Sequence, residues 1–97
     1  VAGPSGVSPI FTRTLSKGMT HSDIKRLQQL LNSDPDTRIA SSGVGSPGSE
    51  TNYFGALTEA AVSKFQMKHG VVSSASDAGY GYVGPKTRTQ LNSLLGQ

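Results

Sequence analysis

The side chains that could carry acid–base or metal chemistry are few, and they stand apart in the sequence. His21 and His69 match neither the H-x-H nor the H-E-x-x-H spacing of metal sites. Each is expected at the end of a predicted helix, where a solvated histidine is far more common than a metal ligand or a general base. The sequence therefore predicts no histidine chemistry.

Two carboxylates flank Pro35 and resemble the start of a calcium-binding loop. Asp34 and Asp36 have the alternating spacing of such a loop, but Arg38 and Ile39 stand where its next acidic residue and its glycine would follow. We therefore expect a turn with solvated carboxylates. The sequence predicts no bound metal and no cofactor.

The patterns that activate a nucleophile or bind a phosphate are also missing. The chain has no cysteine, and none of its serines stands in a G-x-S-x-G element. The glycines of residues 43–48 are not followed by the G-K-S/T of a phosphate-binding loop. A glycosidase with paired carboxylates needs a deep cleft, which short helices hardly build. We predict that the protein is not an enzyme.

One element occurs twice and is the strongest pattern in the chain. Residues 53–62 (YFGALTEAAV, the first copy) align with residues 82–91 (YVGPKTRTQL, the second copy). The glycine permits a close approach of loop and helix, and the apolar residue before it is expected to fill the core. The threonine, at the third helical position, is expected to bond a free end group of its own helix.

Three predicted helices must position these copies. The first covers 21–32, with a capping box of Thr20 and Asp23 at its start and Pro35 beyond its end. Its apolar residues recur at helical spacing, and its polar residues occupy other faces. The apolar set is Ile24, Leu27, Leu30 and Leu31, and the polar set is Lys25, Arg26, Gln28 and Gln29.

The second and third helices each begin at a repeat glycine. The second covers 55–70 and carries charges that suit the helix dipole, with Gly70 as its terminating residue. The third opens at Gly84, with Pro85 at its first helical position, and stops at Gly96. The residues predicted to face inward are Leu57, Ala61, Val62 and Phe65 in the second helix and Thr87, Leu91, Leu94 and Leu95 in the third.

Short amphipathic helices have to bury their apolar stripes against one another. We predict an all-α fold, a compact three-helix bundle with an internal pseudo-repeat and two long Gly/Ser-rich loops, 33–52 and 71–83. Ile39 and Val44 are expected to anchor the first loop. Residues 1–10 are predicted to form a linker and 11–97 the domain. Phe11, Leu15 and Met19 are expected to close the core.

Charge and hydropathy narrow the range of partners. The chain has 97 residues, a net charge of +3 and 15% charged residues. Its basic residues are scattered and form no stripe, which disfavours nucleic acid as a partner. No apolar run approaches the roughly 18 residues of a membrane span, and the start of the chain lacks the pattern of a signal peptide.

Three ordered motifs resemble those of a known family. Residues 18–31 are similar to its first-helix pattern, a glycine followed by D-V-x-x-L-Q-x-x-L. Residues 53–66 are similar to its F-G-x-x-T-x-x-A-V-x-x-F-Q pattern, and residues 83–91 to its closing V-G-x-x-T-x-x-x-L. This is the bacterial peptidoglycan-binding-like domain, and the resemblance covers residues 11–95. The loops depart from it, because 33–52 is longer and 71–82 carries additional Ser, Asp and Tyr.

The resemblance implies a three-helix, non-catalytic module that binds peptidoglycan through its glycan or stem peptide. It implies a role in anchoring or targeting a larger exported protein, with a fused catalytic or surface domain, in the cell envelope or outside the cell. The alternative is a structural or protein-interaction spacer that docks on a neighbouring domain.

Aromatic rings beside polar groups and free helix N–H groups would suit a saccharide and a stem-peptide carboxylate. The alternative for Tyr53 and Tyr82 is a partly buried core plug, and for the two threonines a structural role. The predicted ligand-binding residues are Tyr53, Gly55, Thr58, Tyr80, Tyr82, Gly84, Lys86, Thr87 and Arg88.

Overall fold

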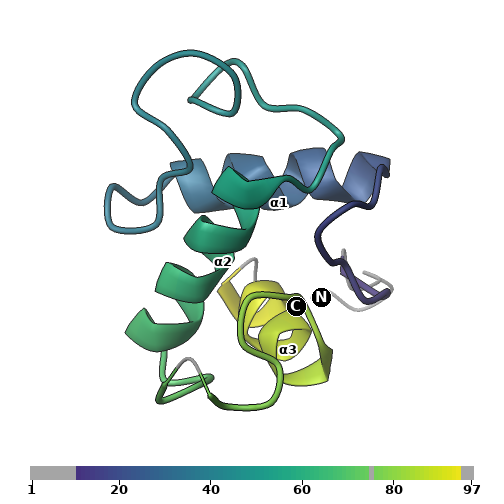
Figure 1. Ribbon diagram of the computed structural model, residues 1–97, viewed down its shortest axis with the longest axis vertical. Helices are drawn as coiled ribbons and strands as arrows, with labels where there is room; N and C mark the ends of the chain where they lie inside the picture. Colours follow the sequence, from purple (N-terminus) through teal and green to yellow (C-terminus); the bar gives the residue numbers. More distant parts are fainter. Residues whose placement is uncertain (1–10, 75, 95–97) are drawn as a thin grey trace, which may run out of the picture.

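Three helices of ten to thirteen residues make up the regular structure. The computed structural model describes residues 11–74 and 76–94. Helix α1 spans Ser22–Asn32, α2 spans Ala56–Lys68 and α3 spans Pro85–Leu94. Figure 1 shows α1 and α3 toward opposite ends of α2. Within the described residues there is no β-strand and there are only two isolated bridges, so the all-α prediction is confirmed.

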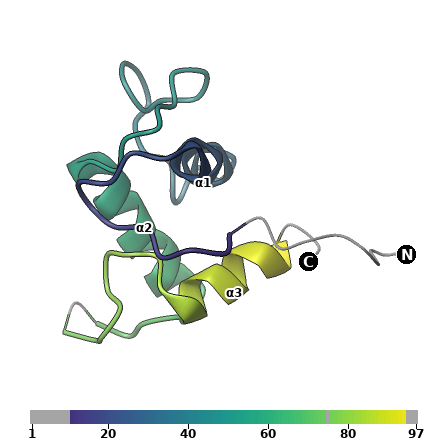
Figure 2. The ribbon, with the colours of Figure 1, turned by 90° about the vertical axis from the view of Figure 1, so that its right-hand side faces the viewer.

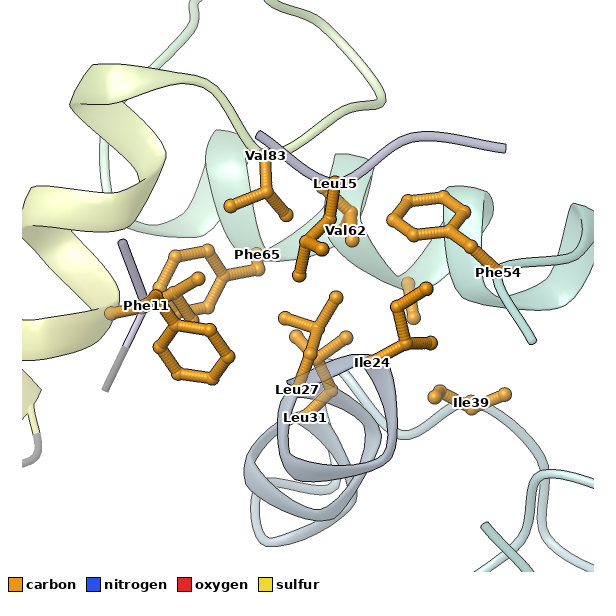
Figure 3. Close-up of a cluster of buried hydrophobic side chains, with 12 residues drawn as sticks. Phe11, Leu15, Ile24, Leu27, Leu31, Ile39, Phe54, Val62, Phe65 and Val83 are labelled. Atoms are coloured by element: carbon orange, nitrogen blue, oxygen red, sulfur yellow. The ribbon is translucent and has the colours of Figure 1, made fainter. Parts of the chain in front are cut away.

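The helices and the segment before α1 share one apolar core. Phe11 and Leu15 reach into it from that segment and are only 2% and 0% exposed, which confirms that the lead-in closes the core. Figure 3 shows their side chains among those of α1 and α2. The cluster comprises Phe11, Leu15, Ile24, Leu27, Leu31, Ile39, Phe54, Ala61, Val62, Phe65, Val83 and Leu91.

The lead-in, residues 11–20, also ties the two copies of the repeat together. Val83 of the second copy and Leu15 exchange backbone hydrogen bonds of 2.8 and 3.2 Å. Phe54 of the first copy donates to the carbonyl of Met19 at 2.9 Å and accepts from Gly18 N–H at 2.8 Å. In Figure 2 this purple segment runs from beside α3, across α2, to the start of α1. The apolar residue before each repeat glycine is 0% exposed, as predicted.

The start of α1 differs from the predicted capping box. Thr20 forms an antiparallel bridge with Tyr53, so the extended chain continues one residue further. His21 is the N-cap residue, and its Nδ1 accepts a hydrogen bond of 3.0 Å from the backbone N–H of Asp23. The prediction of Thr20 as the cap is therefore wrong, because its backbone is held in pairing with the first copy.

The buried stripe of α2 differs from the predicted one only at its first member. Leu57 is 56% exposed, whereas Thr58 is 3% exposed, and the stripe continues through Ala61, Val62 and Phe65. The ends of α2 are as predicted, with Gly55 as the N-cap and Gly70 at a φ of 71°. The prediction of an inward Leu57 is wrong because a partner of Thr58, described below, turns that face toward α1.

Two further expectations about burial are wrong. Leu94 of α3 is 50% exposed, and it is Asn92 that contacts the lead-in: its Oδ1 accepts from Phe11 N–H at 3.0 Å. Val44 is 73% exposed at a loop turn, and Ile39 alone of the two predicted anchors is buried. Leu95 and Gly96 lie outside the described residues. No helix in the described stretches is both long and apolar enough to cross a membrane.

Candidate functional site

A buried glutamine holds the second copy of the repeat against α2. Gln66 is 0% exposed, and its Nε2 donates to the carbonyl of Tyr82 at 2.8 Å and to Thr87 Oγ1 at 3.0 Å. The same nitrogen lies 2.7 Å from the carbonyl of Gly79, and Oε1 accepts from Gly81 N–H at 2.7 Å. We call these contacts the Gln66 network. They fix the tyrosine-bearing loop and the first turn of α3 relative to each other.

The first copy is held by the equivalent residue of α1. Gln28 is 2% exposed, and its Nε2 donates to the carbonyl of Tyr53 at 2.9 Å and to Thr58 Oγ1 at 3.0 Å. Its Oε1 accepts from Thr51 N–H at 2.6 Å. This Gln28 network shares with the Gln66 network the donation to the tyrosine carbonyl and to the threonine hydroxyl, and in both the Oε1 atom accepts from a backbone N–H just before the tyrosine. The repeat therefore includes a glutamine on the preceding helix, as well as the tyrosine, glycine and threonine.

The sequence patterns did not predict the role of either glutamine. Gln28 was predicted to lie on an outer face of its helix, and Gln66 had no predicted role. The signal that could have found them is an apolar residue followed by glutamine, which occurs as L-Q at 27–28 and as F-Q at 65–66. Each of these pairs lies on the helix that precedes one copy of the repeat. The networks also correct the expected role of the threonines. In the described structure Thr58 and Thr87 accept from these glutamines, and neither hydroxyl bonds an end group of its own helix.

The tyrosine of each copy lies with its ring against the glycine of the same copy. A Cβ on Gly55 would stand 3.1 Å from Tyr53 Cε2, and one on Gly84 would stand 3.2 Å from Tyr82 Cε2. Each distance is tighter than ordinary van der Waals contact, so any side chain there would displace the ring. Tyr53 and Tyr82 are 52% and 38% exposed. The rings therefore lie over the start of a helix and at the surface.

A hollow of about 280 Å³ opens beside the second copy. Five of its lining residues are positions of the repeat, and the others come from the loop that precedes α3. Lys86 is the only charged side chain among the described residues that line it. We call it the second-copy hollow. Its lining residues are Val71, Val72, Ala78, Gly79, Tyr82, Gly84, Pro85, Lys86 and Thr87.

A separate hollow of about 200 Å³ opens beside the first copy. It is lined by the same five repeat positions and by residues of the loop after α1. At the position of Lys86 it has Leu57. We call it the first-copy hollow. Its lining residues are Gln28, Ile39, Val44, Gly45, Thr51, Tyr53, Gly55, Ala56, Leu57 and Thr58.

The remaining predicted site residues lie elsewhere. Tyr80, 37% exposed, borders a third, shallow hollow on the outer side of α2 with Lys64 and Met67. Arg88 lines neither copy's hollow, and its Nη1 donates to the carbonyl of Thr12 at 2.8 Å. The structure thus distributes the predicted residues over separate surfaces. Thr58 and Thr87, each 3% exposed, lie beneath the hollows that they line.

The residues considered for acid–base or metal chemistry have structural contacts. His21 caps α1, and the ring of His69 packs on Phe65 with centroids 4.4 Å apart. Asp34 and Asp36 both accept from Lys68 Nζ, the latter at 3.0 Å. The hydrogen bond from Lys68 to Asp34 lowers the pKa of Asp34 below its ordinary 3.8. Across residues 11–74 and 76–94, no three acidic, histidine or cysteine side chains gather as a metal site would require.

Comparison with known proteins gives one finding. A family model described as "Putative peptidoglycan binding domain" matches residues 20–91, from the end of the lead-in to the middle of α3. The match includes both copies of the repeat and both glutamines. No curated protein and no solved structure matches the chain.

Proposed function

The chain belongs to the peptidoglycan-binding domain family, and from that premise we propose that it binds peptidoglycan through the second-copy hollow without catalysing a reaction on it. The module would hold a larger exported protein, with its own catalytic or surface domain, at the cell wall. Family membership supports the ligand class, and the chemistry of the hollow supports the site.

The observation that carries the site is the pairing of Tyr82 with Lys86 at the rim of a preformed hollow. The half-exposed ring of Tyr82 offers an apolar face, which suits the face of a sugar or an alanine methyl group. Lys86 lies in the first turn of α3, where the backbone N–H groups have no partner within the helix. A stem-peptide carboxylate would receive hydrogen bonds from both, and no acidic side chain of the described residues lines the hollow to repel it.

Co-sedimentation with purified wall sacculi tests this function. We expect the domain to pellet with sacculi, and Lys86→Ala or Tyr82→Ala to weaken that binding about tenfold, the effect of losing one charge-assisted hydrogen bond or one aromatic contact. Lys25→Ala on α1 is the matched control, because it removes the same charge from an exposed position outside the hollow. Pelleting no greater than that of an inert protein would disprove the proposal.

A docking role for the domain is the second candidate, and the outer face of α2 supports it. Met67 is 48% exposed beside Tyr80 and Lys64, in the third hollow, and none of the three belongs to the core. If the domain stays in the supernatant when sacculi are pelleted, but binds another domain of its parent protein through this face, it has this docking function in place of wall binding.

A further inference from the structure

The two hollows have the same construction. Each is lined by the tyrosine, the glycine, the next two residues and the threonine of one copy, and each has a buried glutamine that holds the tyrosine-bearing loop in place. We propose that the first-copy hollow is a second ligand site, so that the domain contacts its polymer at two points. This inference rests on the proposed function, because it takes the second-copy hollow as the first point of contact.

The first-copy hollow differs from its counterpart in chemical character. Leu57, 56% exposed, stands where the second copy has Lys86, and Val44, 73% exposed, projects from the facing loop. No charged side chain of the described residues lines this hollow. Its chemistry therefore selects an uncharged, partly apolar group, such as the methyl of an N-acetyl or lactyl substituent on a sugar whose ring lies on Tyr53. The carboxylates of the stem peptide would then bind at Lys86 in the second-copy hollow.

Three apolar or aromatic side chains at this hollow are exposed to solvent. Leu57 and Val44 lie outside the apolar core, although Leu57 was predicted to face inward and Val44 to anchor the loop, and Tyr53 is 52% exposed. The backbone beneath them is nevertheless fixed by the Gln28 network and by Asn32, whose Nδ2 donates to the carbonyl of Gly45 at 2.8 Å. A rigid backbone that presents apolar side chains around a hollow is the arrangement of a preformed binding site.

The spacing of the hollows favours a polymer over a small ligand. The first-copy hollow includes the first turn of α2, and the second-copy hollow includes Val71 and Val72, just beyond the end of that helix. Thirteen helical residues rise about 20 Å, and Figure 1 shows the two ends of α2 in different parts of the molecule. One sugar or peptide unit cannot fill both hollows. A repeating polymer can, and its affinity then exceeds that of either contact alone.

Matched tyrosine variants separate the two sites. We expect Tyr53→Ala and Tyr82→Ala each to weaken binding to sacculi by about tenfold or more, and the double variant to reach background, since losing either contact removes the avidity. Val44 lies at an exposed loop position outside the core. Val44→Ser is therefore also expected to weaken binding to sacculi, without affecting folding. Titration of the wild type with a soluble monomeric muropeptide should shift backbone amide signals at both 53–58 and 82–87.

Three outcomes would overturn the second site, and the first two also show whether the proposed function stands. If Tyr53→Ala and Val44→Ser leave binding to sacculi unchanged while Tyr82→Ala abolishes it, the domain binds at one point and the proposed function stands. If the wild type does not pellet with sacculi, the proposed function fails and the second site fails with it. Chemical-shift changes confined to 82–87 would also contradict two-point contact.

Discussion

Gln28 and Gln66 are the residues on which both halves of the domain depend. Each amide satisfies backbone groups of a loop that would otherwise be buried without partners, and each reaches the threonine in the first turn of the next helix. Burying an amide is unfavourable unless its hydrogen bonds are made. Here both the nitrogen and the oxygen of each amide are hydrogen-bonded. Each glutamine therefore fixes its loop in one position relative to the helix.

We expect Gln66→Leu to lower the free energy of unfolding by about 2–4 kcal/mol, because the change leaves buried polar groups of the loop without partners. The affected groups are the carbonyls of Gly79 and Tyr82, the N–H of Gly81 and the hydroxyl of Thr87. Urea unfolding measures the loss. Gln29→Leu, the same change at an exposed position of α1, is the control and should shift stability by less than about 0.5 kcal/mol. Equal effects of the two changes would contradict a special role for Gln66.

At the scale of elements, the long loop after α1 is ordered by the last residue of that helix. Asn32 is 5% exposed, and its Oδ1 accepts from Ile39 N–H at 2.8 Å. Its Nδ2 donates to the carbonyl of Gly45 and to Glu50 Oε2, at 2.8 and 2.9 Å. Gly45 itself has a φ of 89°, and a Cβ there would stand 2.9 Å from Ile39 Cγ2. One side chain thus fixes a Gly/Ser-rich loop that has a single buried aliphatic anchor.

Asn32→Asp should loosen this loop, because it replaces the donating nitrogen by an oxygen that faces another carboxylate and a carbonyl. The hydrogen bond from Asn32 is the main cause that lowers the pKa of Glu50 below its ordinary 4.5. We therefore expect the pKa of Glu50 to rise in the variant, and amide exchange at Ile39 and Gly45 to become faster. Titration followed by NMR and hydrogen exchange measure the two effects. Asn52→Asp, an exposed change at the far end of the loop, is the control and should leave both unchanged.

At the scale of the whole molecule, several contacts besides the core join segments that are distant in the sequence. One is Lys68, in the last turn of α2, which bridges Asp34 and Asp36 in the turn after α1. The hydrogen bond with Asp34 lowers the pKa of that carboxyl and raises the pKa of Lys68 above its ordinary 10.5. The contribution of Asp34 to stability is therefore complete above about pH 4 and is lost as the pH falls through its lowered pKa. That of Lys68 is complete below 10.5 and is lost as the pH rises through its raised pKa.

Lys68→Met should therefore raise the pKa of Asp34 toward 3.8, because the hydrogen bond that stabilises its ionised form is removed. An NMR titration of the Asp34 carboxyl carbon measures this change. Lys64 lies on the same helix, is exposed and makes no ion pair with Asp34. Lys64→Met should therefore leave the pKa of Asp34 unchanged. An unchanged pKa in Lys68→Met would mean that the ion pair is not formed in solution.

Local sequence determined the helices and their ends. Gly55, Pro85 and Gly70 act at the positions predicted for them, because capping depends on the backbone preferences of one or two residues. The same holds for the repeat, whose apolar member before each glycine fills the core. Thr20 is the exception, since its pairing with Tyr53 is a long-range contact that no local pattern contains.

Tertiary structure alone decided which side chains face the solvent and how the predicted site is divided. Leu57 is exposed and Gln28 buried because Thr58, Thr51 and the Tyr53 carbonyl bring to Gln28 the partners that a buried amide needs, from more than twenty residues away. A helical stripe read from hydropathy places leucine inside and glutamine outside, since it does not include those partners. For the same reason the sequence showed only that a tyrosine element occurs twice, whereas the packing of each copy against the glutamine of the preceding helix separated the two copies into two hollows.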